Sequence, residues 1–379
     1  MPSNITAGKA VKICYSVRMR KKAPAITDPS AFIGVNGGGV ISFGSGQPDL
    51  PPPKEVFKTL QTPRLFKYGL IKGDEALREA LAKEYPGAQA EDFVITNGAS
   101  EALDLVFRAL KEMTGGGKIL LCRPYYYSYP PIVELAGLTP VYTDLKEGKI
   151  DLEDFKKKVR GVKAVLVNSP SNPTGRVEDL ATLRAIERIC RAKGVYIISD
   201  EVYKDLIYER ENYLIKGPHV ITVNSFSKTY SMCGLRIGYL YARDKRIVDG
   251  VVSIKVHTSM NTNILGQEMA LRAMHVPRSF VRKQVPIWKK RRDFIYGGLI
   301  AMGFDLWKPE GAFYVLPKIK HSKKVVSELF HQHKVIVYDG AWFGAPGRIR
   351  LSYALELPKI KEGLARIKKY IKGKESWLV

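Results

Sequence analysis

From about residue 92, short runs of apolar residues alternate with segments in which apolar residues recur every three or four positions. The runs are apolar throughout, as in strands that are buried on both faces of a sheet. The spacing in the intervening segments is that of amphipathic helices. This order predicts an α/β domain of three layers, in which helices cover both faces of a mostly parallel sheet. The predicted strands are residues 93–95, 118–122, 164–167, 195–198 and 220–223, and the predicted helices are residues 100–113 and 180–193.

The last hundred residues have a different pattern. The spacing predicts a long basic helix over residues 281–302 and a final helix over residues 357–371. We therefore predict a large domain over residues 46–280 and a smaller α+β domain over residues 281–379, with residues 1–45 as an N-terminal arm that joins the smaller domain. Short strands of the smaller domain are predicted at residues 311–316, 335–338 and 349–353.

The chain has 379 residues, of which 45% are hydrophobic, and this suits a protein with two sizeable cores. No apolar run approaches the roughly 18 to 20 residues that cross a bilayer, and the N-terminus lacks the pattern of a signal peptide. The four cysteines are far apart in the sequence and have neither CxxC nor zinc-site spacing. We therefore expect a cytoplasmic protein with no membrane partner and no metal.

The net charge of +24, from 61 basic and 37 acidic residues, is unusual. Such a field attracts nucleic acids and other anions. The basic residues are spread along the chain, however, and clusters such as residues 289–292 and 368–369 fall in predicted amphipathic helices. Solvated helix faces are the interpretation that this pattern favours. The sequence has no helix-turn-helix, RNP or zinc-finger pattern, so we expect no specific nucleic-acid partner.

Lys228 stands in a stretch of small and hydroxyl-bearing residues that covers residues 225–238. Small residues let a flat, phosphorylated group approach the backbone, and the Ser225 hydroxyl with the Arg236 guanidinium can hold a phosphate. An amine at position 228 can form a Schiff base with an aldehyde. These features together predict the cofactor pyridoxal 5'-phosphate (PLP). A surface lysine in a Ser/Gly loop is the alternative that this stretch alone leaves open.

Ligands of open α/β sheets bind beyond the carboxyl ends of the strands, and polar clusters follow several predicted strands at that edge. After residues 93–95, the N–H groups of Ala99 and Ser100 at a helix start can bind an anion; an ordinary N-cap is the alternative. After residues 118–122, Tyr126 can stack on a flat ring; a loop packed under a domain interface is the alternative.

Two further clusters are more specific. Residues 168–175 contain two prolines and a glycine, a rigid turn that can aim the Asn172 amide at one oxygen. Asp200 ends a predicted buried strand, where a carboxylate needs a cationic partner such as a protonated pyridine nitrogen. Tyr203 can donate to the phenolic oxygen of the same ring. A helix N-cap at Asp200 is the alternative.

Arginines within an apolar strand pattern distinguish residues 347–354. A buried arginine is costly unless it is paired, and a substrate carboxylate held by two hydrogen bonds would pair it. The alternation favours Arg350 over Arg348, while a structural ion pair is the alternative. His331 and His333 have no acidic or cysteine companions at ligand spacing, so we interpret them as a helix end rather than a metal site.

Taken together, these motifs resemble the class I/II aminotransferases, which are PLP enzymes of fold type I. The resemblance runs from about residue 41 to residue 354, and its motifs follow the order of the family. The matching pieces are residues 46–49, 68–73, 77–78, 172–175, 200–203, 225–228, 234–238 and 309–314. Cys233 and Leu235 depart from common members of the family, but both are interpreted as packing changes that leave Lys228 and Arg236 in place.

The resemblance implies an aminotransferase that moves an amino group from an L-amino acid to a 2-oxo acid by a ping-pong mechanism. It implies that Lys228 holds PLP in the Schiff base and shuttles a proton, with Asp200 at the pyridine nitrogen. Arg350 would bind the substrate α-carboxylate beside the backbone of Gly46. The remaining implied roles are Tyr203 and Asn172 at the ring hydroxyl, Tyr126 stacked on the ring, and Ala99, Ser100, Ser225 and Arg236 at the phosphate.

The resemblance also implies a homodimer, in which Tyr68 reaches the phosphate of the neighbouring subunit. The substrate side chain stays open at this stage. Ser100 stands where one subgroup carries lysine, and residues 256–264 contain no arginine, which argues against strict dicarboxylate specificity. Aromatic, alanine-type or broad substrates are compatible with the sequence, and aspartate stays a candidate because it is common among such enzymes.

Two alternatives accompany this interpretation. A PLP-dependent lyase or decarboxylase can be built on the same scaffold, and its products would distinguish it from a transferase. A nucleic-acid-binding regulator with a relic PLP fold is suggested by the charge of +24. Regulators of that kind carry an added DNA-binding module, and the 45 residues before the motifs are too few to contain one.

Overall fold

The computed structural model describes residues 26, 28–32, 34–35, 37–61, 67–210 and 212–378. Its α-helices are α1 Glu75–Ala82, α2 Gly98–Thr114, α3 Tyr129–Leu135, α4 Leu152–Lys158, α5 Leu180–Lys193, α6 Phe226–Thr229, α7 Lys245–Thr258, α8 Ile264–Met274, α9 Ser279–Ile300, α10 Ser322–His333 and α11 Leu357–Ile371. Its strands are β1 Ile41–Ser42, β2 Phe93–Thr96, β3 Lys118–Arg123, β4 Thr139–Lys146, β5 Lys149–Ile150, β6 Val162–Asn168, β7 Tyr196–Asp200, β8 Val220–Ser225, β9 Gly238–Ala242, β10 Tyr314–Val315, β11 Val335–Ile336, β12 Tyr338–Asp339 and β13 Ile349–Ser352.

The largest sheet has the strand order β2-β9-β8-β7-β6-β3-β4-β5. The central strands β4, β3, β6, β7 and β8 are parallel to one another. Strand β9 runs antiparallel to both of its neighbours, and β5 runs antiparallel to β4. The mostly parallel sheet predicted from the apolar runs is therefore confirmed, and each of the five predicted strands of this sheet forms with small shifts at its ends.

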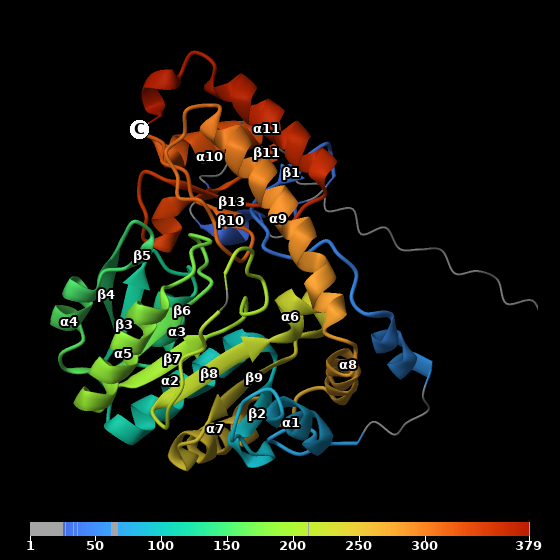
Figure 1. Cartoon of the computed structure of the whole chain (residues 1–379), viewed down its shortest axis with the longest axis vertical. Helices are drawn as coiled ribbons and strands as arrows, with labels where there is room; N and C mark the ends of the chain where they lie inside the picture. The colour runs from blue at the N-terminus through green and yellow to red at the C-terminus, as the bar shows by residue number, and fades with distance from the viewer. Residues whose placement is uncertain are drawn as a thin grey trace, which may run out of the picture.

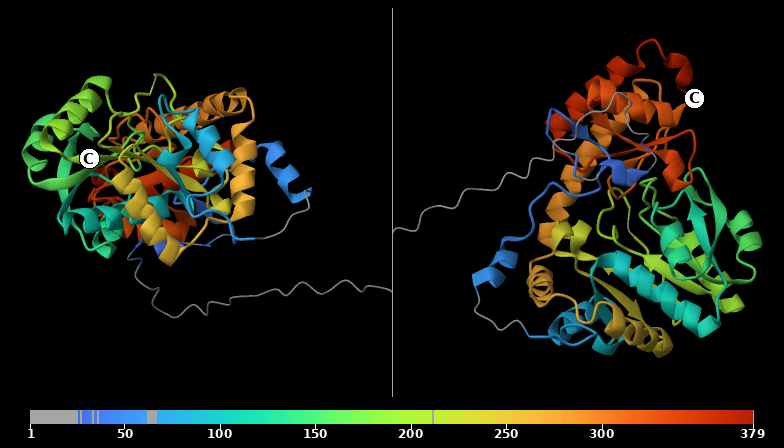
Figure 2. Two further views of the ribbon diagram at one scale, coloured as in Figure 1. Left: turned by 90° about the horizontal axis from the view of Figure 1, so that it is seen from below. Right: turned by 180° about the vertical axis from the view of Figure 1, so that it is seen from behind.

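Helices cover both faces of this sheet. On one face, α2, α3 and α7 pack on the strands, and Phe107 and Val251 share a buried cluster with Leu121 of β3. On the other face, α4 and α5 bury Phe155 and Ile186 against strand residues of the same sheet. Figures 1 and 2, seen from the front and from behind, show the helices on opposite sides of the strands. The result is the predicted three-layer α/β arrangement.

The C-terminal part of the chain forms a second group of elements. A three-stranded sheet of order β10-β13-β12 and the parallel pair β1-β11 lie beside α9, α10 and α11 (Figure 1). Strand β1 comes from the N-terminal part of the chain, and Phe32 packs in the same core as Trp288 and Tyr353. Residues near the N-terminus therefore pack with the C-terminal elements, while the domain boundaries at residues 45 and 280 stay predictions.

Two predicted strands of the C-terminal part differ from the structure. Only residues 314–315 of the predicted strand 311–316 pair in a sheet, because Ala312 has a positive φ of 51° and the Gly311 N–H donates to Gly175 O. The predicted strand 335–338 divides at Val337 into two short strands. Its first half pairs with β1 and its second half with β13, so one run of apolar residues serves two sheets.

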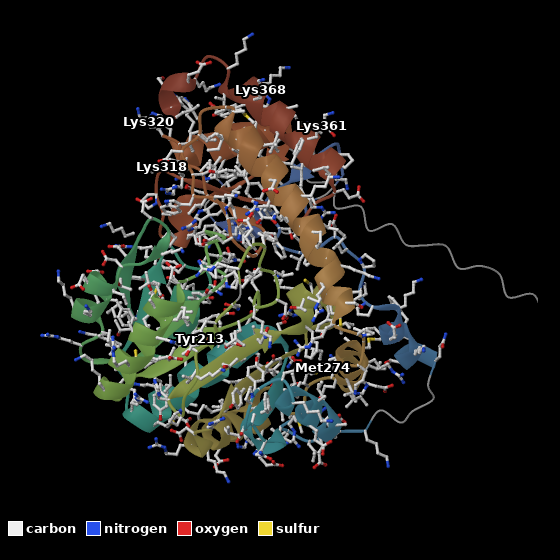
Figure 3. The ribbon with its side chains drawn as sticks, viewed as in Figure 1. Tyr213, Met274, Lys318, Lys320, Lys361 and Lys368 are labelled. Atoms are coloured by element: carbon white, nitrogen blue, oxygen red, sulfur yellow. The ribbon has the colours of Figure 1, made fainter. Side chains whose placement is uncertain are left out.

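The positive charge is unevenly distributed along the chain. Residues 281–379 contain 21 basic and 8 acidic residues, whereas residues 46–280 contain 34 and 28. The side chains of Lys320, Lys361 and Lys368 are exposed and point away from the C-terminal core (Figure 3). Lys361 and Lys368 lie on α11 and agree with the expected solvated helix face, whereas Lys320 lies in a turn before α10. The expectation is wrong for Arg291 and Arg292 in the cluster at residues 289–292, because both are buried on α9 and pair with acidic residues. No helix among the described residues is long and apolar enough to cross a membrane.

Candidate active site

A cavity of about 450 Å³ lies at the carboxyl ends of β6, β7 and β8, where the large sheet meets the C-terminal elements. This is the edge at which open α/β sheets bind ligands. A second cavity of about 320 Å³ shares Ser225 with it, but the other predicted site residues do not line that second cavity. The first cavity is lined by all but one of the predicted site residues, namely Gly46, Ala99, Ser100, Tyr126, Asn172, Asp200, Tyr203, Ser225, Lys228, Arg236 and Arg350.

Lys228 lies in α6, a single helical turn that follows β8 directly. Ser225 caps this turn, because its Oγ accepts a hydrogen bond of 3.1 Å from the backbone N–H of Ser227. The Lys228 Nζ donates to the backbone oxygen of Gly46 at 2.9 Å. Among the described residues, no carboxylate forms an ion pair with Lys228, so its amine is available to a group bound in the cavity.

Asp200 ends β7 and does not cap a helix. Its Oδ2 accepts a hydrogen bond of 2.6 Å from the Tyr129 hydroxyl, and its Oδ1 accepts one of 3.2 Å from the Val202 N–H. The side chain is buried, with only 4% of its residue exposed. Burial raises the pKa of Asp200 to about 6, although the hydrogen bonds and the charge of Lys228 act to lower it. A buried acid of this kind needs a cation beside it to stay ionised.

This raised pKa predicts how the cofactor-free protein depends on pH. The unfolded carboxyl has a pKa of about 3.9, so between that value and about 6 the folded protein binds a proton that the unfolded chain has lost. The stability from this group is therefore complete below about pH 4 and is lost as the pH rises through 6, by about 3 kcal/mol. Asp200→Asn should remove this loss, so urea unfolding should show the variant gaining stability over the natural protein as the pH rises.

Glu201 is the internal reference for that measurement, because burial also raises its pKa, to about 7. Its contribution is present in both proteins, and its hydrogen bonds are to Tyr85, Ser199 and Thr222, which are not partners of Asp200. The difference between the two proteins therefore reports on Asp200. An Asp200→Asn variant whose stability follows the same pH curve as the natural protein would contradict the assignment of a raised pKa to this side chain.

Arg350 reaches the cavity from β13 and is 2% exposed. Its Nη1 donates to Asn172 Oδ1 at 3.1 Å, and its Nη2 donates to the backbone oxygen of Gly44. Its Nε has no hydrogen-bond partner among the described residues, and no described carboxylate pairs with the guanidinium. A buried guanidinium without an anion is costly, and this one lines a cavity that an anion can enter.

Arg348, the other arginine of this strand region, has a different environment. Its Nη1 donates to the backbone oxygen of Leu316 at 2.8 Å, and its guanidinium lies 4.0 Å from the ring centre of Trp307. The described cavity lining includes Arg350 but not Arg348. The structure therefore places in the cavity the arginine that the alternation favoured.

Hydrogen bonds of the turn at residues 168–175 link the end of β6 to the end of β7. Asn168 Nδ2 donates to the backbone oxygen of Asp200 at 3.1 Å, and Asn168 Oδ1 accepts from the Asn172 N–H at 2.9 Å. The backbone of Gly175 then accepts from Glu310 at 2.7 Å. This network holds the turn against the end of β7, and the Asn172 Oδ1 accepts a hydrogen bond from Arg350, as the rigid sequence of the turn suggested.

Tyr203 and Gly46 both lie against Tyr314. The hydroxyls of Tyr203 and Tyr314 are 2.7 Å apart and share a hydrogen bond. A Cβ atom at position 46 would lie 1.9 Å from the Tyr314 hydroxyl, so only glycine fits there. Gly46 thereby brings its backbone oxygen within reach of Lys228.

One end of the cavity is built to hold an anion. The first turn of α2 presents the backbone N–H groups of Ala99 and Ser100 at the positive end of a 17-residue helix. A Cβ atom at Gly98, whose φ is 78°, would lie 2.4 Å from Arg236 Nη2, so the glycine lets this guanidinium lie against the helix start. Within the described structure, Arg236 donates only to backbone oxygens and is paired with no carboxylate.

Tyr126 lines the cavity and meets the ring of Tyr129 edge-on, with ring centres 5.4 Å apart. Tyr68 is the predicted site residue that does not line the described cavity. It is 83% exposed. Its predicted role concerns a neighbouring subunit, so the single chain leaves that role a prediction.

Sequence reasoning missed three residues that support the site. Tyr129 donates to Asp200, Asn168 ties Asn172 to β7, and Tyr314 packs between Tyr203 and Gly46. Tyr129 stands in the same run of tyrosines as Tyr126, and Tyr314 ends the motif of residues 309–314. The sequence contained these signals, but nothing in it indicated which tyrosine of a run faces which partner.

The residues fit PLP together with an amino-acid substrate. Lys228 offers an amine for an aldehyde, and Asp200 is a buried acid that needs a cation such as a pyridinium nitrogen. The α2 N-terminus and Arg236 form a site for a phosphate. The unpartnered Nε of Arg350 offers a second, separate site for a carboxylate. Clusters of three or more potential metal ligands are absent from the part of the chain that the structure describes.

Comparison with known proteins agrees with this chemistry. The sequence matches a probable aspartate/prephenate aminotransferase of Aquifex aeolicus with 35% identity, over 91% of this chain and 94% of that protein. The crystal structure of an aspartate aminotransferase from Thermotoga maritima superposes with a TM-score of 0.83 at 33% identity, covering 91% and 95% of the two chains. An aromatic aminotransferase from Pyrococcus horikoshii superposes with a TM-score of 0.84 at 30% identity, covering 92% and 99%.

The family model described as aminotransferase class I and II matches residues 38–367. PLP is the cofactor of this family, and the residues of the cavity described above fit that cofactor. The chain therefore belongs to the class I and II aminotransferases.

Proposed function

We propose that this PLP-dependent aminotransferase acts through the residues gathered in the 450 Å³ cavity. The observation that carries the proposal is that three groups of different chemistry meet there: the amine of Lys228, the buried acid of Asp200 and the guanidinium of Arg350 with its unpartnered Nε. An amine, a carboxylate that keeps the ring nitrogen protonated and a site for the substrate carboxylate are what transfer of an amino group from an L-amino acid to a 2-oxo acid requires.

Each residue has a defined task in the proposed mechanism. PLP, when bound, supplies an aldehyde that takes up the amino group and a ring that withdraws electrons. Lys228 Nζ would hold the cofactor covalently, and its free amine would accept the proton that leaves the substrate Cα. Asp200 would keep a proton on the ring nitrogen, and Arg350 would hold the α-carboxylate so that Cα faces Lys228.

The other predicted residues bind and orient. Arg236, the Ser225 hydroxyl and the N–H groups of Ala99 and Ser100 hold the phosphate. Hydrogen bonds with Asn168 and Tyr314 hold Asn172 and Tyr203 in place, where they would contact the ring hydroxyl. Tyr126 would stack on the ring. These assignments are supported by the position of every one of these residues on the wall of one cavity.

Product analysis tests this function against a lyase on the same fold. The PLP-loaded protein is mixed with ¹⁵N-labelled amino acids and an unlabelled 2-oxo acid. Transfer predicts that the label appears in the amino acid derived from the added 2-oxo acid, together with the 2-oxo acid of the donor. Release of carbon dioxide or of a cleaved side chain, with no label in a new amino acid, would show a lyase instead and refute the proposal.

We further propose that the protein is a cytoplasmic homodimer. Tyr68 and Leu70 are exposed, and a Cβ atom at Gly69 between them would lie 3.6 Å from Asn261, next to the exposed Met260. Exposed apolar side chains gathered in this way suit contact with a second copy of the chain. The free thiols of Cys122, Cys190 and Cys233 suit a reducing compartment.

Tyr68→Phe tests the contribution of the neighbouring subunit. If the Tyr68 hydroxyl donates to the phosphate across the dimer, its loss should weaken PLP binding about 10-fold or more, the cost of a hydrogen bond to a charged group. Equilibrium dialysis measures the cofactor affinity, and light scattering measures the mass of both proteins. Unchanged affinity in a variant that stays dimeric would remove Tyr68 from the phosphate site.

A further inference from the structure

Three aromatic rings line the cavity next to Arg350 but have no task in the proposed chemistry. They belong to Phe32, Tyr127 and Tyr338. The Tyr338 ring centre is 4.8 Å from the Arg350 guanidinium carbon, so this wall begins where the α-carboxylate would be held. A substrate bound by its carboxylate must place its side chain somewhere in the cavity space beyond that point.

The rings form one continuous wall. Phe32 stacks on Tyr338, with ring centres 5.9 Å apart and planes 17° apart. Tyr127 meets Phe343 edge-on at 5.7 Å, and Phe343 in turn lies 4.6 Å from the Arg350 guanidinium carbon. Phe32 and Tyr338 are only 6% and 8% exposed, so their neighbours fix their positions. The wall therefore presents a rigid aromatic surface to the cavity.

The cationic side chains among the described cavity residues already have tasks in the proposed function. Among the described residues that line the cavity, the cations are Lys228, Arg236 and Arg350, and each already has a partner in the proposed function. The second carboxylate of an aspartate substrate would lose its water of hydration against aromatic rings. It would find no partner there, because each of the described cations of the cavity already has one. An aromatic side chain would instead gain stacking and edge contacts with the same rings.

We infer that the substrate side-chain site prefers an aromatic ring, so that phenylalanine and tyrosine are better amino donors for this protein than aspartate. The inference rests on the proposed function, because it takes the position of the α-carboxylate from Arg350. The inferred donor differs from the aspartate named for several relatives, because the inference follows from the residues that line this cavity and not from the comparison.

Single-turnover experiments measure the preference directly. The PLP-loaded natural protein is mixed with L-phenylalanine, L-tyrosine, L-aspartate or L-alanine without a 2-oxo acid, and the change in cofactor absorbance gives a second-order rate for each donor. We expect the two aromatic donors to react at least about 10-fold faster than aspartate, the factor that a few apolar contacts provide.

Tyr127→Ala supplies the structural test. It removes one ring from the wall and should lower the ratio of the phenylalanine rate to the alanine rate about 10-fold. Tyr125→Ala is the matched control, because Tyr125 stands two positions away, is half-buried and is not among the described cavity residues. The control should leave the ratio unchanged. A ratio within one protein is insensitive to partial unfolding, which lowers both rates alike.

The outcomes separate the inference from the function on which it rests. Aspartate reacting as fast as phenylalanine or faster would overturn the aromatic preference and leave the aminotransferase function intact. It would show that a cation from outside the described cavity residues enters the site. An unchanged ratio in Tyr127→Ala would likewise overturn the role of the wall. No reaction with any of the donors would count against the inference and the proposed function together.

Discussion

Lys228→Ala is expected to lower turnover by about 10⁴-fold, the upper end of what a positioned acid–base group contributes. The amine is the group that holds the cofactor covalently and carries the substrate proton, and the cavity contains no second lysine among its described residues. The binding groups for the phosphate and the ring nitrogen stay in place, so the variant should still bind PLP. Steady-state rates with saturating donor and 2-oxo acid measure the loss.

Borohydride reduction followed by mass spectrometry of the peptide that contains residue 228 gives a second readout. The natural protein should retain the cofactor mass on Lys228, and the alanine variant should retain none. Lys245→Ala is a suitable control, because Lys245 is exposed on α7, outside the cavity, and should change neither rate nor labelling. Turnover close to the natural rate in Lys228→Ala would refute the assignment of the catalytic amine.

Arg350→Met is expected to separate function from stability. Loss of the guanidinium removes the charged hydrogen bonds to the substrate carboxylate and should lower kcat/KM by about 10²-fold to 10³-fold, the range for truncating a buried charged partner. The folded protein loses the hydrogen bonds to Asn172 and Gly44, but it no longer buries a guanidinium that has no carboxylate partner among the described residues. Methionine fills similar space among the surrounding rings, so the free energy of unfolding should stay the same or rise.

Arg292→Met is the matched control for this second prediction. Arg292 is as buried as Arg350, but its Nη2 pairs with Glu209 at 2.7 Å and its Nε with Asp293 at 2.7 Å. Its loss should lower the free energy of unfolding by about 2 kcal/mol. Urea unfolding of the cofactor-free proteins compares the two variants. A fall in stability for Arg350→Met as large as that for Arg292→Met would show that Arg350 is a structural arginine.

The sequence determined the large sheet and the positions of its strand ends. Runs such as residues 220–223 are apolar throughout because they are buried on both faces of the sheet. This pattern can be recognised within the run itself, without knowledge of the rest of the chain. The carboxyl ends of parallel strands meet at one edge, so polar residues after three such strands had to gather there. The sequence alone therefore predicts that Asn172, Asp200 and Lys228 lie close together.

The tertiary structure decided how those residues are paired and what surrounds them. Tyr129 rather than a neighbouring tyrosine donates to Asp200, and residues 335–338 divide between two sheets. The unpartnered Nε of Arg350 and the wall that joins Phe32 to Tyr338 depend on residues far apart in the chain. Periodicity reports only whether a position is buried. It does not report which distant segment buries that position, because long-range packing selects the partner.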